Sequence, residues 1–158
     1  MGRMAFMNPF SRLKPEDMNI IMNSASLTGI IHLLERNIMT LSDGERRLVL
    51  ISCGLSQDTD IMLLDEPANS LDPDKSARVY KLLRELADDG KSIIASVHDV
   101  NISRSYSDYY IALKEGRLIS HGDIHELNEE ILYELYSVRF KAYHDNEGNS
   151  LMWHALPE

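Results

Sequence analysis

The sequence is poor in three features, and each scarcity excludes a class of protein. It has one cysteine, Cys53, so no disulfide can form within the chain, and a reducing compartment, by default the cytoplasm, is expected. Its longest apolar run is the five residues from Tyr109 to Leu113, far short of the ~20 that cross a bilayer. Sixteen Lys and Arg against twenty-five Asp and Glu give a net charge of −9, which argues against a surface that binds nucleic acid throughout.

The length and composition fit one compact domain. The chain has 158 residues, of which 44% are hydrophobic and 26% charged, and this is enough for a sizeable core. It contains no internal repeat, low-complexity tract or Gly/Ser linker, but its pattern changes near residue 41. We therefore expect one continuous domain with a helical first part at residues 1–40 and a second part at residues 41–158.

The residues before this change favour helices. Pro15 is suited to begin a helix that ends at Thr28-Gly29. Apolar residues follow Pro15 at the spacing of one helix face, namely Met18, Ile21, Met22 and Ala25. A second short helix is expected at residues 30–34.

From residue 41 onward, helices alternate with short apolar strands. Ser42 is expected to cap a helix that reaches about Leu55, and Asp72 to cap a helix that Gly90 ends. Residues 61–64 and 92–97 predict strands buried on both faces. Strand, helix and strand in succession predict parallel pairing, and therefore an α/β sheet with flanking helices.

The carboxyl-terminal part favours antiparallel pairs. Glu115-Gly116 is a turn sequence between two apolar runs, which predicts a hairpin. The expected elements are strands at 109–114 and 117–120, a helix at 129–136, and a final strand pair at 139–144 and 151–154 turned by residues 145–149.

Two adjacent carboxylates, Asp65 and Glu66, follow the first apolar strand. Ligands of parallel sheets bind at the carboxyl ends of the strands, so these acids are placed where a Mg²⁺-bound phosphate could be held. Adjacent side chains on an extended segment point apart, which leaves one acid for the metal and the other for an attacking water. The alternative is that both acids only cap the next turn.

A second candidate site lies at the start of the helix that Ser42 caps. The Ser42 hydroxyl, the free backbone N–H groups and the positive end of the helix form an anion site. The alternative is an ordinary capping box, because Ser42 and Glu45 have the S-x-x-E spacing.

The order of these elements resembles the nucleotide-binding domain of ATP-binding-cassette (ABC) ATPases, a P-loop NTPase-like fold. Four motifs carry the resemblance: Leu41 to Glu45, Ile61 to Glu66, Asn69 to Asp72, and His98 after the second strand. They resemble the signature motif, Walker B with its catalytic glutamate, the D-loop and the switch histidine. The opening helices resemble the family's helical subdomain, so the resemblance covers essentially the whole chain.

The resemblance implies a role for each candidate site residue. Glu66 and His98 would be catalytic, and Asp65 would hold Mg²⁺. ATP held by a second ATPase subunit would be bound by the signature and D-loop residues Ser42, Asp43, Gly44, Glu45 and Asp72. It also implies a membrane permease as partner, no nucleic acid, and a cytoplasmic location on the inner face of the membrane.

Three further stretches narrow the resemblance to one type of importer. These are His98 to Asn101, the turn from Lys114 to Arg117, and the closing strand pair. They resemble ATPase subunits that serve iron-siderophore, haem and cobalamin importers.

The sequence lacks the phosphate-binding motif G-x-x-x-x-G-K-[ST] of such ATPases. Its one Gly-Lys-Ser, Gly90-Lys91-Ser92, has Glu85 where the first Gly is required. It also ends a predicted helix and begins a strand, whereas a phosphate loop ends a strand and begins a helix. We therefore expect a C-terminal portion of an ABC ATPase that is inactive by itself.

The signature departs from the family pattern at Asp43, where the family usually has Gly. A carboxylate ~4 Å from a γ-phosphate is repelled by a few kcal/mol at an effective dielectric near 20, and the repulsion vanishes if the side chain points away. Arg47, where many relatives have Gln, and Ala68, where Thr or Ser is common, are milder departures.

Three other interpretations remain open. One is a DNA-repair or chromosome-maintenance ATPase of the same superfamily, although no sustained heptad pattern for a coiled-coil arm is present. Another is a non-catalytic binding module that docks on a partner ATPase or a permease. The third is a dimer formed by the joining of unpaired sheet edges.

Overall fold

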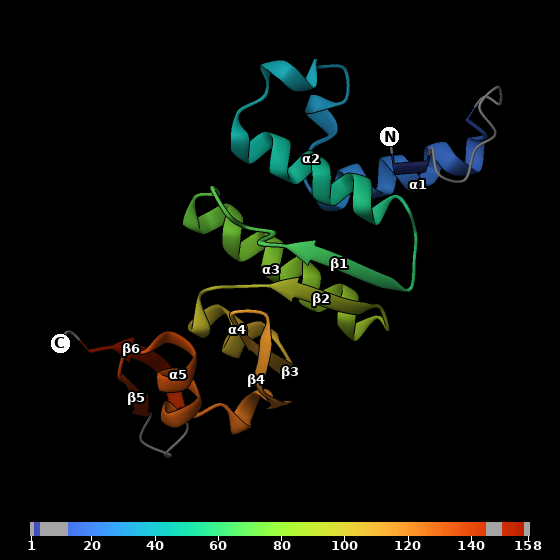
Figure 1. The fold of residues 1–158 in the computed structure, drawn as a ribbon. Coiled ribbons are helices and arrows are strands. Elements are labelled where there is room, and N and C mark those ends of the chain that lie inside the picture. Colours follow the sequence, from blue (N-terminus) through green and yellow to red (C-terminus); the bar gives the residue numbers. More distant parts are fainter. Residues whose placement is uncertain (1, 4–12, 145–149, 157–158) are drawn as a thin grey trace. The chain divides into compact units, whose positions relative to one another are not determined.

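The computed structural model describes residues 2–3, 13–144 and 150–156. The chain divides into two compact units, Met1–Ser96 and Val97–Glu158 (Figure 1). The expected boundary between residues 40 and 41 is of a different kind, a change of sequence pattern inside the first unit, and stays a prediction.

The first unit opens with helix α1 (Pro15–Leu27), as the sequence predicts. Pro15 occupies its first position, and the chain leaves it at Gly29, whose φ of +71° favours glycine. The predicted apolar face is only partly correct, because Met18 and Met22 are exposed while Ala25 is fully buried. An ion pair between Arg3 Nε and Asp17 Oδ1 (2.9 Å) ties residue 3 to this helix.

The predicted second short helix at residues 30–34 is present as a 3₁₀ helix, shorter than expected. This stretch forms a single 3₁₀ turn, η2 (Ile31–Leu33), and a further turn, η3 (Ile38–Thr40), follows it. Asn37 then accepts a hydrogen bond from the Met39 N–H and so caps η3, which begins a separate turn. The two turns wrap a small apolar cluster of Ala25, Ile30, Leu33 and Leu41.

Helix α2 (Asp43–Leu55) confirms the predicted helix after Ser42. It packs against α1 and buries Ile51, Ser52 and Leu55, three of the four residues expected on its inner face. Leu48, the fourth, is half-buried against the cluster formed by the two turns.

Strands β1 (Ile61–Asp65) and β2 (Ser92–Ser96) pair in parallel, as predicted (Figure 1). The expectation that both are buried on both faces is wrong. Leu63 is 73% exposed, and Ile61 and Ile94 are also exposed. Within the described residues these two strands form a two-stranded sheet, so each side chain has few neighbours to cover it.

Helix α3 (Pro73–Asp88) connects the two strands and lies along β2 (Figure 1). Asp72 caps it and Gly90 follows it, as predicted. Pro73 occupies its first position, and the helix buries Val79, Leu82 and Leu83. No helix of the described residues is both long and apolar enough to cross a bilayer.

The second unit is built around an apolar core of Ile124, Leu127, Leu132 and Trp153. The predicted hairpin is confirmed, with a turn at Glu115-Gly116 in which both residues have positive φ. Its second strand runs to Asp123, beyond the predicted end. The elements are α4 (Val100–Tyr106), β3 (Tyr109–Lys114), β4 (Arg117–Asp123), η4 (Ile124–Glu126), α5 (Glu129–Tyr136), β5 (Phe140–His144) and β6 (Ser150–Ala155).

The last two strands pair antiparallel, as predicted. The predicted turn at residues 145–149 lies outside the described residues.

Candidate functional site

The start of α2 is a complete capping box. Ser42 Oγ accepts a hydrogen bond from the Glu45 backbone N–H (3.3 Å), and Glu45 Oε2 accepts from the Ser42 N–H (2.8 Å) and hydroxyl (2.9 Å). The bond from the Ser42 backbone is the largest cause that lowers the pKa of Glu45. The capping interpretation is therefore confirmed, and phosphate binding at the same place stays a prediction.

Asp43 and Gly44 follow in the first turn of α2. The Asp43 carboxylate is 83% exposed and lies 3.7 Å from Arg46 Nη1, a cation that offsets its charge. A Cβ on Gly44 would stand 3.3 Å from Leu71 Cδ2, tighter than ordinary contact, so the Leu71 side chain would have to move by a few tenths of an ångström to admit it. The helix start thus packs closely on the loop that precedes α3.

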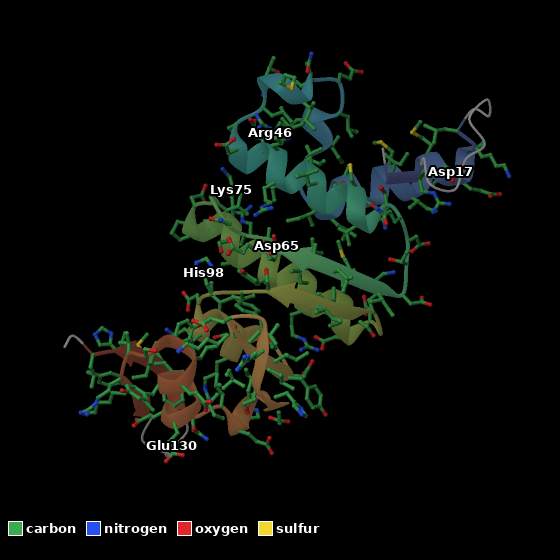
Figure 2. The ribbon with its side chains drawn as sticks, in the orientation of Figure 1. Asp17, Arg46, Asp65, Lys75, His98 and Glu130 are labelled. Carbon is green, nitrogen blue, oxygen red and sulfur yellow. The ribbon has the colours of Figure 1, made fainter. Side chains whose placement is uncertain are left out.

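Asp65 ends β1 at the carboxyl edge of the parallel pair (Figure 2). Its register partner is Ser96, the last residue of β2. Ser96 Oγ donates a hydrogen bond to Asp65 Oδ1 (2.6 Å) and accepts one from the Glu66 N–H (2.9 Å). One hydroxyl on the neighbouring strand therefore fixes both acids relative to the sheet.

Glu66 lies in a turn beyond the strand, with a φ of +43°. The expectation that it shares an extended segment with Asp65 is wrong, because β1 ends one residue earlier. Its carbonyl accepts a hydrogen bond from Arg47 Nη2 (2.6 Å) and another from the Asn69 N–H (3.0 Å). Asn69 Nδ2 also donates to Glu66 Oε2 (2.6 Å). The backbone carbonyl and the side-chain carboxylate of Glu66 are thus both fixed by hydrogen bonds.

Asp72 caps α3. Its Oδ1 accepts from the Lys75 N–H (3.0 Å), and its Oδ2 lies 2.9 Å from Lys75 Nζ. The Lys75 backbone and side chain lower the pKa of Asp72, and the bond to Asp72 raises the pKa of Lys75. Figure 2 shows Lys75 at the start of α3. This geometry fixes the loop before the helix.

His98 belongs to the second unit, between β2 and α4. Its side chain is exposed, and its carbonyl accepts a hydrogen bond from the Tyr136 hydroxyl (3.3 Å). Burial, and then the charge of Asp99, raise the pKa of Tyr136. Asn101 exchanges two hydrogen bonds with the Trp153 backbone, so β6 also braces the helix that follows His98.

The structure distributes the predicted site residues over the two units. Ser42, Asp43, Gly44, Glu45, Asp65, Glu66 and Asp72 lie in the first unit, and His98 lies in the second. In the first unit, Arg47 links α2 to the Glu66 turn, and Gly44 packs toward the loop before Asp72. The signature, acid and D-loop segments are therefore neighbours.

The donor set fits the group that the resemblance implies. Asp65 at the end of β1 and Ser96 at the end of β2 offer hard oxygen atoms, the kind of ligand that Mg²⁺ prefers. The first N–H groups of α2 have no partner within an α-helix and suit a phosphate. Ser42 would have to turn its hydroxyl from Glu45 to donate to that phosphate.

Sequence reasoning missed three residues that form hydrogen bonds with the two acids. Ser96 bonds to both of them, Asn69 donates to the Glu66 carboxylate, and Arg47 donates to the Glu66 backbone carbonyl. A signal for Ser96 was available, because parallel strands of equal length bring their last residues together. For Arg47 the sequence shows only that it stands where many members of the family have Gln, which does not reveal its bond to Glu66.

Gly90-Lys91-Ser92 is confirmed not to be a phosphate loop. Gly90 follows α3 with a φ of +96°, and β2 begins at Ser92. Lys91 Nζ donates to the Thr59 carbonyl (3.0 Å) and lies 3.5 Å from Asp58 Oδ1. The lysine therefore ties the loop before β1 to the start of β2.

Comparison with known proteins identifies the family. A family profile described as "AAA domain, putative AbiEii toxin, Type IV TA system" matches residues 18–104, just over half of the chain. The chain is 37% identical over 134 residues to the petrobactin import ATP-binding protein YclP of Bacillus subtilis, covering 82% of this chain and 53% of that protein. It is 35% identical over 140 residues to the ferric enterobactin transport ATP-binding protein FepC of Escherichia coli, covering 87% and 52%.

Solved structures agree with the sequence comparison. The chain superposes on "An inward-facing conformation of a putative metal-chelate type ABC transporter" with a TM-score of 0.85 and 25% identity, covering 99% of this chain and 64% of that one. The chain spans about half the length of the curated relatives it matches. The motifs, the fold and these relatives together show that the chain belongs to the ATP-binding protein family of ABC transporters.

Proposed function

We propose that this chain supplies the signature, Walker B, D-loop and switch-histidine portion of an ATP-hydrolysing subunit of an ABC importer, of the iron-siderophore type. Relatives named for petrobactin import and ferric enterobactin transport support the substrate class. The observation that carries the proposal is the pair of acids at the end of β1, whose positions are fixed by hydrogen bonds. Asp65 and Glu66 share the Ser96 hydroxyl, and Glu66 is also held by Arg47 and Asn69.

Each acid then has a separate task. Asp65 would hold Mg²⁺ through water, and a bound Mg²⁺ would offset charge on the phosphates. Glu66 would orient the attacking water and accept its proton, because its carboxylate is fixed in a turn beyond the strand. His98 would donate to the γ-phosphate.

The start of α2 would serve a different nucleotide, held by a second ATPase subunit. Ser42, Gly44 and the first N–H groups of the helix would bind its γ-phosphate, and Asp43 would stay turned toward Arg46. Asp72, which fixes the loop packed on Gly44, would couple the two sites. The remaining partner would be a membrane permease, with the subunit on the cytoplasmic face of the membrane.

The proposal includes inactivity of the isolated chain. The printed sequence contains no G-x-x-x-x-G-K-[ST], the motif whose backbone N–H groups and lysine hold the β- and γ-phosphates. The acids of the first unit therefore need a phosphate-binding segment from elsewhere.

The test restores that segment. The whole chain is joined behind the amino-terminal half of a full-length relative that carries G-x-x-x-x-G-K-[ST], and phosphate release from Mg-ATP is measured. We expect turnover that Glu66→Gln lowers by at least about 100-fold, because the general base is lost. Asp60→Asn, an exposed acid just before β1, is the matched control and should keep the rate. Equal turnover in both variants would contradict the proposal.

A further inference from the structure

Arg47 on α2 makes a long-range side-chain contact to the turn at Glu66. Its Nη2 donates a 2.6 Å hydrogen bond to the carbonyl of Glu66, 19 positions along the chain. Arg47 is half-buried, so this charged donor is partly shielded from water. A hydrogen bond from an ionised donor is stronger than a neutral one, and shielding strengthens it further.

The turn that receives this bond is one that needs support. Glu66 has a φ of +43°, a conformation that costs a non-glycine residue free energy and persists where its surroundings enforce it. Pro67 is fully buried and Ala68 is buried, which anchors the carboxyl side of the turn. The Arg47 bond anchors the peptide that joins Glu66 to Pro67.

We infer that Arg47 is a positioning residue that couples the start of α2 to Glu66. Binding of a nucleotide phosphate at the Ser42 end of the helix would then change the orientation of the Glu66 carboxylate. This inference rests on the proposed function, in which Ser42 and Glu66 face different nucleotides. Arg47 lies five residues beyond Ser42 on the same helix. A helix is stiff over this span of about 7.5 Å, so a shift at its start moves the guanidinium with it.

The preceding residue, Arg46, does not contact Glu66 in this way, so the proposed role belongs to Arg47 and not to any arginine in this turn of the helix. Its guanidinium points to the helix start, where Nη2 donates to the Leu41 carbonyl (3.2 Å) and Nη1 pairs with Asp43. Figure 2 shows Arg46 near the beginning of α2. The two consecutive arginines thus contact different segments: Arg46 contacts the signature segment at the start of α2, and Arg47 contacts the turn at Glu66.

The first test uses the chain by itself and follows hydrogen exchange of the Glu66 and Asn69 backbone N–H groups. The Asn69 N–H donates to the same carbonyl as Arg47, so it reports on the turn directly. We expect Arg47→Met to speed exchange of both groups about tenfold or more, and Arg47→Lys to restore much of the protection. Arg78→Met removes an exposed guanidinium on α3 and should leave both unchanged.

The second test uses the fused protein described under the proposed function. We expect Arg47→Met to lower kcat between about 10-fold and 100-fold with KM for ATP changed less than about threefold, since Arg47 positions Glu66 without touching the nucleotide. Arg47→Lys should recover part of kcat. If Glu66→Gln abolishes turnover but Arg47→Met behaves like Arg78→Met in both tests, the inference is overturned while the proposed function stands.

Discussion

The two units of the chain hold their candidate site residues in different ways. In the first unit the functional side chains themselves are engaged: Ser42 with Glu45, Asp65 with Ser96, Glu66 with Asn69 and Asp72 with Lys75. In the second unit, Tyr136 donates a hydrogen bond to the backbone carbonyl of His98, and Asn101 ties α4 to the Trp153 backbone. These contacts in the first unit thus join side chain to side chain, whereas those of Tyr136 and Asn101 in the second unit join side chain to backbone.

The units are alike in how they bury apolar surface. Each has a buried cluster of four apolar residues, around Ala25 in the first unit and around Trp153 in the second. Each also leaves strand side chains exposed, such as Leu63 in the first unit and Ile111 in the second. The stability of each unit therefore depends on its buried side chains and little on these exposed ones.

The largest expected effect on the free energy of unfolding comes from replacing a buried leucine and not an exposed one. Leu132→Ala should lower the free energy of unfolding by about 2–5 kcal/mol, because Leu132 is 1% exposed and its removal leaves a cavity. Leu63→Ala on β1, where Leu63 is 73% exposed, should change it by less than about 0.5 kcal/mol. Urea titration followed by fluorescence of Trp153, the chain's one tryptophan, and by circular dichroism measures both. Similar losses in the two variants would break the comparison.

A smaller effect is expected from the capping box. Ser42→Ala should cost about 0.5–2 kcal/mol, because the Glu45 N–H loses its acceptor and the Glu45 carboxylate loses a donor. Ser26→Ala, at an exposed serine within α1, is the control. Circular dichroism should show the loss while the Trp153 fluorescence transition stays in place. A shift of that transition instead would mean that the cap supports the second unit.

The smallest effect is a difference in pH response. The pKa of Glu45 is lowered from its ordinary 4.5, so its contribution to stability is complete above pH 4.5 and is lost as the pH falls through the folded value. The pKa of Tyr136 is raised from its ordinary 10.0, so its contribution is complete below pH 10 and is lost as the pH rises further.

Melting curves across pH test these opposite signs. Glu45→Gln should reduce the acid loss seen by circular dichroism, and Tyr136→Phe should reduce the alkaline loss seen by Trp153 fluorescence. A Glu45→Gln variant that keeps the full acid dependence would show that other carboxylates carry it; Asp17 and Asp72 also have lowered pKa values.

Local signals predicted the helix starts well. Ser42 and Asp72 cap helices where expected because a cap depends on residues within one turn. The parallel pairing of β1 and β2 also followed from element order alone. The short helix expected at residues 30–34 is a 3₁₀ helix of three residues, because apolar spacing alone does not distinguish a 3₁₀ turn from an α-helix.

The extent of strand burial and the bonds from side chains to distant backbone groups could not be predicted. Strand burial was overestimated at Leu63 because an apolar run does not state how many neighbours a strand will have. The bonds from Arg47 to Glu66 and between Asn101 and Trp153 join a side chain to a distant backbone, and any residue can supply a backbone group. Such bonds leave no pattern in the sequence, yet they set the geometry of the site.

The measurement that tests the account most directly is phosphate release from Mg-ATP by the purified chain alone. The account predicts no turnover, because Asp65 and Glu66 are fixed as a pair while the motif that holds the β- and γ-phosphates is absent from the sequence. Turnover by the isolated chain that disappears in Glu66→Gln would contradict it.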